Sequence, residues 1–126
     1  MSRPRKIFIV EDHTWVREAL SAMLSLQPNL EVCGSAAGVD EALAALPAGA
    51  DLVLVDLGLQ DQSGLDLLSI IHERWPALPC VVLSNQPAEL FQEAAQRAGS
   101  SAYVEKGDAP ALLAAIESVF QEPLVD

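Results

Sequence analysis

The sequence predicts an α/β fold in which a five-stranded parallel sheet is doubly wound, with helices on both faces. Five short apolar segments of strand length alternate with five longer segments that have helical periodicity. The segments at 52–55 and 80–83 are apolar at every position, as expected for strands that are buried on both faces of a parallel sheet. Right-handed crossovers then favour the strand order 2-1-3-4-5.

Turn residues and changes of period delimit the elements. We expect strands at residues 6–10, 30–35, 52–56, 80–84 and 101–105. We expect helices at residues 14–27, 39–46, 65–75, 87–98 and 109–120. Pro28 follows the first helix, Pro87 suits the first position of the fourth, and Gly99 suits the position after its end. Asp108 is a suitable cap for the last helix.

The composition is that of one globular domain. The chain has 126 residues, of which 51% are hydrophobic and 20% are charged, enough to bury a core. No apolar run reaches membrane-spanning length, and Glu11-Asp12 interrupts the first one, so we expect no signal peptide and a cytoplasmic protein. Cys33 and Cys80 lie in strand-like apolar segments, which predicts two core thiols rather than a disulfide or a metal site.

The net charge of −11 restricts the class of partner. A surface this acidic repels the phosphates of nucleic acid, so we expect no DNA binding by this segment itself. An acidic site can instead hold a divalent cation.

Carboxylates follow two strands that this topology places side by side. Glu11 and Asp12 come directly after the first strand, and Asp56 ends the third. Ligands of open α/β sheets bind at the carboxyl ends of the strands. Three carboxylates there repel one another unless a cation bridges them, and an oxygen-rich site suits Mg²⁺. A metal beside Asp56 would also prepare it to attack phosphorus.

Ser84 ends the fourth strand, and Lys106 directly follows the fifth. The topology therefore places both residues at the same edge of the sheet. They would supply a hydroxyl and an ammonium for developing charge. Each residue alone has an ordinary interpretation: Asp12 or Asp56 as a helix cap, Ser84 as a turn residue, Lys106 as a solvated lysine. Because all of these residues are expected at the same edge of the sheet, a functional site there is favoured over separate structural roles. His13 and His72 receive no role.

The chain resembles a receiver domain of bacterial two-component response regulators over essentially its whole length. The resemblance rests on Ile-Phe-Ile-Val-Glu11-Asp12-His, Leu-Val-Leu-Val-Asp56-Leu-Gly-Leu with Gly64 eight residues on, Val-Val-Leu-Ser84, and Ala-Tyr103-Val-Glu-Lys106. The local sequences around Glu11 and Lys106 are most similar to those of the NarL/FixJ branch, whose members carry a C-terminal LuxR-type helix-turn-helix. The implied fold is flavodoxin-like, with residues 1–121 as the receiver and 122–126 as a tail or the start of a linker.

The resemblance implies a role for each residue. Asp56 would accept a phosphoryl group from a sensor histidine kinase or a phosphotransfer protein, and the chain would catalyse its own phosphorylation and dephosphorylation without being a separate enzyme. Asp12, Asp56 and the Gly58 carbonyl would bind Mg²⁺, or Mn²⁺ in its place, with Glu11 contributing through water. Ser84 and Lys106 would contact the phosphoryl group, and Tyr103 would turn inward as Ser84 moves. The output would be control of transcription through a DNA-binding domain. A second copy of the chain would be a further partner, in a homodimer, and no membrane partner is expected.

Three residues depart from the family's usual pattern. Gln60 replaces a usual proline and is expected to loosen the loop after Asp56. Asn85 replaces a smaller residue, and we expect it to slow the loss of phosphate. Gly107 replaces a proline found in many receivers, so the cis bond that this proline forms cannot occur.

Alternative functions are a stand-alone or degenerate receiver that acts as a protein-interaction module, a phosphatase-like enzyme, and a flavodoxin-type cofactor protein. Haloacid-dehalogenase-type enzymes require an aspartate at position 58, which is glycine here. Cofactor binding would require a glycine-rich phosphate loop, and the sequence has none.

Overall fold

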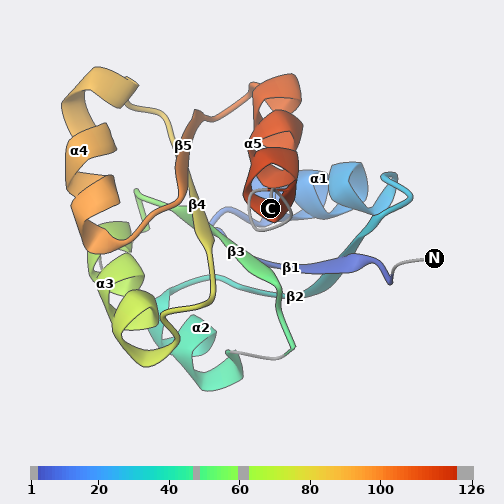
Figure 1. Cartoon of the computed structure of the whole chain (residues 1–126), viewed down its shortest axis with the longest axis horizontal. Helices are drawn as coiled ribbons and strands as arrows, with labels where there is room; N and C mark the ends of the chain where they lie inside the picture. The colour runs from blue at the N-terminus through green and yellow to red at the C-terminus, as the bar shows by residue number, and fades with distance from the viewer. Residues whose placement is uncertain (1–2, 47–48, 60–62, 122–126) are drawn as a thin grey trace.

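The computed structural model describes residues 3–46, 49–59 and 63–121 and confirms the predicted five-stranded parallel sheet. The strands are β1 (Arg5–Val10), β2 (Leu30–Ala36), β3 (Leu52–Asp56), β4 (Cys80–Ser84) and β5 (Ala102–Glu105). They pair in the order β2-β1-β3-β4-β5, and every pair is parallel. Figure 1 shows β1 and β3 side by side in the middle of the sheet.

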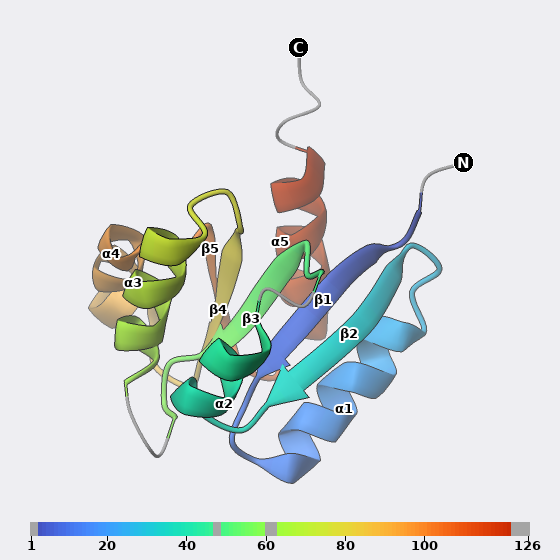
Figure 2. The same ribbon diagram turned by 90° about the horizontal axis from the view of Figure 1, so that it is seen from below.

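Helices cover both faces of the sheet, as the alternation of elements predicts. They are α1 (Thr14–Ser25), α2 (Val39–Ala45), α3 (Gly64–Arg74), α4 (Ala88–Ala98) and α5 (Ala109–Gln121). Figure 2 shows α1 and α5 on one face and α2, α3 and α4 on the other. Among the described helices, none is long and apolar enough to cross a membrane.

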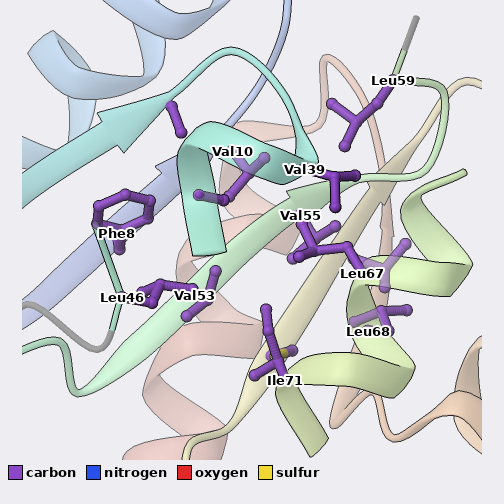
Figure 3. Close-up of a cluster of buried hydrophobic side chains, with 14 of the residues drawn as sticks. Phe8, Val10, Val39, Leu46, Val53, Val55, Leu59, Leu67, Leu68 and Ile71 are labelled. Carbon is purple, nitrogen blue, oxygen red and sulfur yellow. The ribbon is translucent and has the colours of Figure 1, made fainter. Parts of the chain in front are cut away.

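The core has two layers because side chains of a strand alternate between its faces. Ile7 and Ile9 of β1 join the layer beneath α1 and α5. Phe8 and Val10 join the layer beneath α2, α3 and α4, shown in Figure 3. All four side chains are buried. Both layers reach the central strand β3, whose five residues are all buried, so Asp56 lies at the end of a strand that is packed on both faces.

Several helix boundaries differ from the prediction by one residue, and the end of α1 differs by two. Helix α1 ends at Ser25, two residues early, because Leu26 and Gln27 donate to carbonyls three residues back and tighten the chain before Pro28. Pro87 occupies the N-cap of α4 in an extended conformation rather than its first turn. The predicted caps at Gly99, with φ of +113°, and at Asp108, whose Oδ1 accepts from Ala111 N at 3.0 Å, are confirmed.

The two cysteines are free thiols with different burial. Cys80 is a core residue, as predicted, and burial raises the pKa of its thiol to about 12. Cys33 is only half-buried, since β2 is an edge strand, and its Sγ lies 3.5 Å from the Ile7 carbonyl oxygen. The prediction of a plain core residue therefore holds for Cys80 and only in part for Cys33.

Candidate functional site

The strand register brings the predicted site residues to one edge of the sheet. Val10 is opposite Val55, so Glu11 and Asp12 follow β1 beside the end of β3. Asp56 is opposite Leu83 in β4. One ligand atom from each of Glu11, Asp12, His13 and Asp56 lies within 4.8 Å of the others. The predicted juxtaposition of the three carboxylates is therefore present.

The carboxylates are held away from solvent. Glu11 is fully buried and Asp56 is 3% exposed. An isolated buried charge costs several kcal/mol, so such groups require a cation or hydrogen-bond donors. The site supplies these from the end of β5 and from the start of α1.

Lys106 joins two of the carboxylates. Its Nζ lies 3.0 Å from Asp56 Oδ2 and 3.0 Å from Glu11 Oε1, and its side chain is only 14% exposed. Burial acts to lower the pKa of Lys106, but the hydrogen bond to Asp56 and the ion pair with Glu11 outweigh it and raise the pKa above its ordinary value. The lysine is therefore charged at neutral pH and directed at the oxygen of Asp56.

His13 also contacts the cluster, which the sequence did not indicate. Its Nδ1 lies 3.1 Å from Glu11 Oε2 and 3.1 Å from Asp12 Oδ1. The only signal in the sequence was its position directly after two carboxylates at a strand end. Arg17 is a further residue that was not predicted: its guanidinium donates to the Glu11 carbonyl at 2.7 Å and anchors α1 to this turn.

Asp12 carries the least satisfied carboxylate of the cluster. Its side chain is 8% exposed. Its Oδ1 contacts His13 Nδ1 at ion-pair distance without hydrogen-bond geometry, and its Oδ2 has no hydrogen-bond partner among the described residues. A buried carboxylate oxygen that lacks a donor is costly unless a cation binds there. Carboxylate oxygens are the ligands that Mg²⁺ prefers, so the residues present fit a divalent cation.

Gly58 contacts Asp56 through its backbone. Its N–H donates to Asp56 Oδ1 at 3.0 Å, so both carboxylate oxygens of Asp56 are oriented, one by Gly58 and one by Lys106. A Cβ at Gly58 would lie 3.8 Å from Asp56 Oδ1, an ordinary contact. A small side chain at position 58 would therefore not clash with Asp56.

Ser84 and Tyr103 are joined through the backbone of Gln86. Ser84 is buried and its Oγ accepts from Gln86 N at 3.0 Å. The Tyr103 hydroxyl donates to the Gln86 carbonyl at 3.0 Å. Ser84 borders the carboxylate site, whereas Tyr103 is half-buried and packs against the layer beneath α2, α3 and α4. The structure therefore separates Tyr103 from the carboxylates but connects it to Ser84.

A pocket of about 320 Å³ opens onto Asp56. Residues at strand ends and in the loops that follow them line it, among them His13, Asp56, Gly58, Ser84, Asn85 and Lys106. Asn85 is exposed at this opening. Gln60 and the tail at 122–126 lie outside the described residues.

Comparison with known proteins gives one family and several relatives. Residues 7–117 match the response regulator receiver domain family. The chain is 37% identical over 102 residues to the DNA-binding transcriptional activator DevR/DosR of Mycobacterium tuberculosis, a match that covers 80% of this chain and 47% of the relative. It is 32% identical to the transcriptional regulatory protein UhpA of Salmonella typhimurium, covering 90% of this chain and 57% of the relative. The chain thus spans about half the length of these relatives.

Solved structures agree in fold. A two-component response regulator of the LuxR family from an Aurantimonas species superimposes with a TM-score of 0.85 at 30% identity, covering 92% of this chain and 84% of that one. A CheY-like response regulator receiver domain protein from Methanospirillum hungatei has a TM-score of 0.85 at 27% identity, covering 94% and 95%.

Proposed function

This chain belongs to the response regulator receiver domain family, and on that premise we propose that Asp56 is the phosphoacceptor of a two-component system. A sensor histidine kinase or a phosphotransfer protein would donate the phosphoryl group. One observation supports this role above the others: both oxygens of Asp56 are oriented, by Gly58 N–H and by Lys106 Nζ, at the floor of an open pocket.

The proposed metal is Mg²⁺, with Mn²⁺ as an alternative. Asp12, Asp56 and the Gly58 carbonyl would hold it, and Glu11 would contribute through water. The unpartnered Oδ2 of Asp12 supports this assignment, because a cation would satisfy it. When bound, such a metal neutralises charge on the phosphoryl oxygens.

The chain's own residues would organise the transfer. An oxygen of Asp56 forms a bond to phosphorus while the bond between phosphorus and the donor's nitrogen breaks, and that electron pair remains on the donor imidazole. Lys106, already 3.0 Å from Asp56 Oδ2, would pair with the charged product. Hydrolysis of the acyl phosphate by water would restore Asp56.

Ser84 and Tyr103 are proposed to carry the conformational response. The Ser84 hydroxyl accepts from Gln86 N, so its own proton is available for a phosphoryl oxygen. A shift of Ser84 would move the Gln86 backbone, and Tyr103 holds that backbone through its carbonyl. The expected inward turn of Tyr103 would break this hydrogen bond, as in other two-state switches that phosphate contacts bias.

The output is proposed to be control of transcription by a LuxR-type DNA-binding domain in the whole protein, in the cytoplasm. The relative DevR/DosR is named as a DNA-binding activator, and this chain covers about half of it. The net charge of −11 supports assigning DNA contact to another domain. A homodimer and the effect of Asn85 on phosphate loss remain predictions.

Incubation with acetyl phosphate and Mg²⁺, followed by intact-protein mass spectrometry, tests the function. We expect a mass increase of one phosphoryl group in the wild type and none in Asp56→Asn. Asp66→Asn, at an exposed carboxylate of α3, is the matched control and should be modified like the wild type. No increase in any variant would indicate a degenerate receiver, and acetyl phosphate turnover without a mass increase would indicate an enzyme.

A further inference from the structure

His13 places an imidazole nitrogen among the carboxylates of the proposed metal site. Its Nδ1 is 3.1 Å from Glu11 Oε2 and 3.1 Å from Asp12 Oδ1. The ring is 58% exposed, so Nε2 can carry the proton in water while Nδ1 faces the acids. The buried and unpartnered Oδ2 of Asp12 is an independent sign that a cation belongs beside this nitrogen.

We propose that His13 Nδ1 is a ligand of this site and makes it select divalent transition-metal ions over Mg²⁺. The inference rests on the proposed metal site and adds a nitrogen to its oxygen ligands. In an octahedral site with bonds of about 2.1 Å, adjacent ligand atoms lie about 3.0 Å apart. The contact of 3.1 Å between His13 Nδ1 and Asp12 Oδ1 matches this spacing.

The chemistry of the ligands sets the selectivity. Mg²⁺ favours oxygen donors and gains little from an imidazole, whereas Mn²⁺, Co²⁺ and Ni²⁺ bind nitrogen with affinity that rises in that order. The backbone positions His13 for this task, because its N–H donates to Glu11 Oε2 and its carbonyl accepts from Arg17 N in the first turn of α1. The nitrogen is therefore held beside Asp12 by a helix start rather than by a free loop.

A different role for His13 is that of a counter-ion that only donates from Nδ1 to the acids. The two roles differ in one measurable quantity. Loss of a counter-ion changes the affinities for all divalent ions by a similar factor, because it changes only the local charge. Loss of a nitrogen ligand weakens Ni²⁺ binding much more than Mg²⁺ binding.

Calorimetric titration of tag-free protein with MgCl₂ and with NiCl₂ distinguishes the two roles. We expect the preference for Ni²⁺ over Mg²⁺, as the ratio of dissociation constants, to fall by at least about tenfold in His13→Ala and in His13→Gln. His72→Ala removes the chain's other histidine, which is exposed on α3, and should keep the wild-type ratio. A smaller fall in the His13 variants overturns the proposal.

Pulsed electron paramagnetic resonance of the Mn²⁺-loaded protein is a second readout that does not depend on affinity. Coupling to a ¹⁴N nucleus is expected in the wild type and in His72→Ala and should be lost in His13→Ala. Its absence from the wild type overturns the inference. Phosphorylation of the wild type by acetyl phosphate with Mg²⁺ separates the two hypotheses: if it occurs without the nitrogen signature, the role of His13 alone is wrong.

Discussion

At the level of single residues, Lys106 connects two buried carboxylates of the site. It is one of two lysines in a chain with 18 acidic residues, and its Nζ bridges Asp56 and Glu11 at 3.0 Å each. Because the carboxylates it contacts are buried, the ion pairs raise the pKa of Lys106 despite the opposing effect of its own burial. Its charge is therefore part of what keeps the carboxylates together.

The raised pKa of Lys106 predicts how stability depends on pH. The folded state binds the lysine proton more tightly than the unfolded state, so the contribution of Lys106 is fully present below its ordinary pKa of 10.5. It is lost as the pH rises through the higher folded value. We expect the free energy of unfolding of the wild type relative to Lys106→Met to fall progressively above about pH 10.5.

Urea unfolding of both proteins from pH 8 to pH 12 measures this difference. Lys6→Met removes the other lysine, which lies at the opposite end of β1, and subtracts the general effect of losing one positive charge from an acidic chain. A difference that stays constant over this range would contradict the coupling between Lys106 and the carboxylates.

At the level of elements, the connection from β3 to α3 positions Asp56. Ser63 caps α3 by accepting from Leu65 N at 3.1 Å, and Gly64 N donates to the Leu57 carbonyl at 3.2 Å. A Cβ at Gly64 would lie 2.6 Å from Leu57 Cα and would also clash with the Asp56 carbonyl oxygen. Glycine is therefore required here, because the helix begins in direct contact with the backbone that carries Asp56.

Gly64→Ala is expected to destabilise the fold by about 2 kcal/mol or more, because α3 must move away from the end of β3. Gly58→Ala is the matched control in the same connection. A Cβ there makes only an ordinary contact with Asp56 Oδ1, so we expect a change within about 0.5 kcal/mol. Urea unfolding measures both values, and equal effects of the two substitutions would refute the steric explanation.

At the level of the whole molecule, charge repulsion at the carboxylate cluster lowers the stability of the fold. Five parallel strands bring polar chain ends to one edge, and the net charge of −11 adds repulsion to the cluster there. Three acids with one lysine and one histidine leave an excess of negative charge in a largely buried place. A divalent cation that binds the native state and not the unfolded state would relieve this repulsion and so stabilise the fold.

Mg²⁺ is therefore expected to stabilise the folded chain. At about 100 times its dissociation constant, the free energy of unfolding should rise by about 2.7 kcal/mol, which raises the melting temperature by several degrees. Asp12→Asn should lose most of this increase, whereas Asp66→Asn, outside the cluster, should keep it. Thermal unfolding at constant ionic strength, with NaCl replacing MgCl₂, measures the effect. An equal response in the two variants would argue against Asp12 as a ligand.

The sequence by itself determined the parallel sheet, its strand order and the edge at which Glu11, Asp12 and Asp56 meet. These follow from periodicity and crossover handedness, because every parallel strand ends on the same side. The tertiary structure alone decided which atoms meet there. It turned His13 towards the acids, set Lys106 between Glu11 and Asp56, and placed Tyr103 apart from them on the Gln86 carbonyl. These contacts depend on side-chain rotamers and on helix packing, which distant residues impose and which local patterns do not contain.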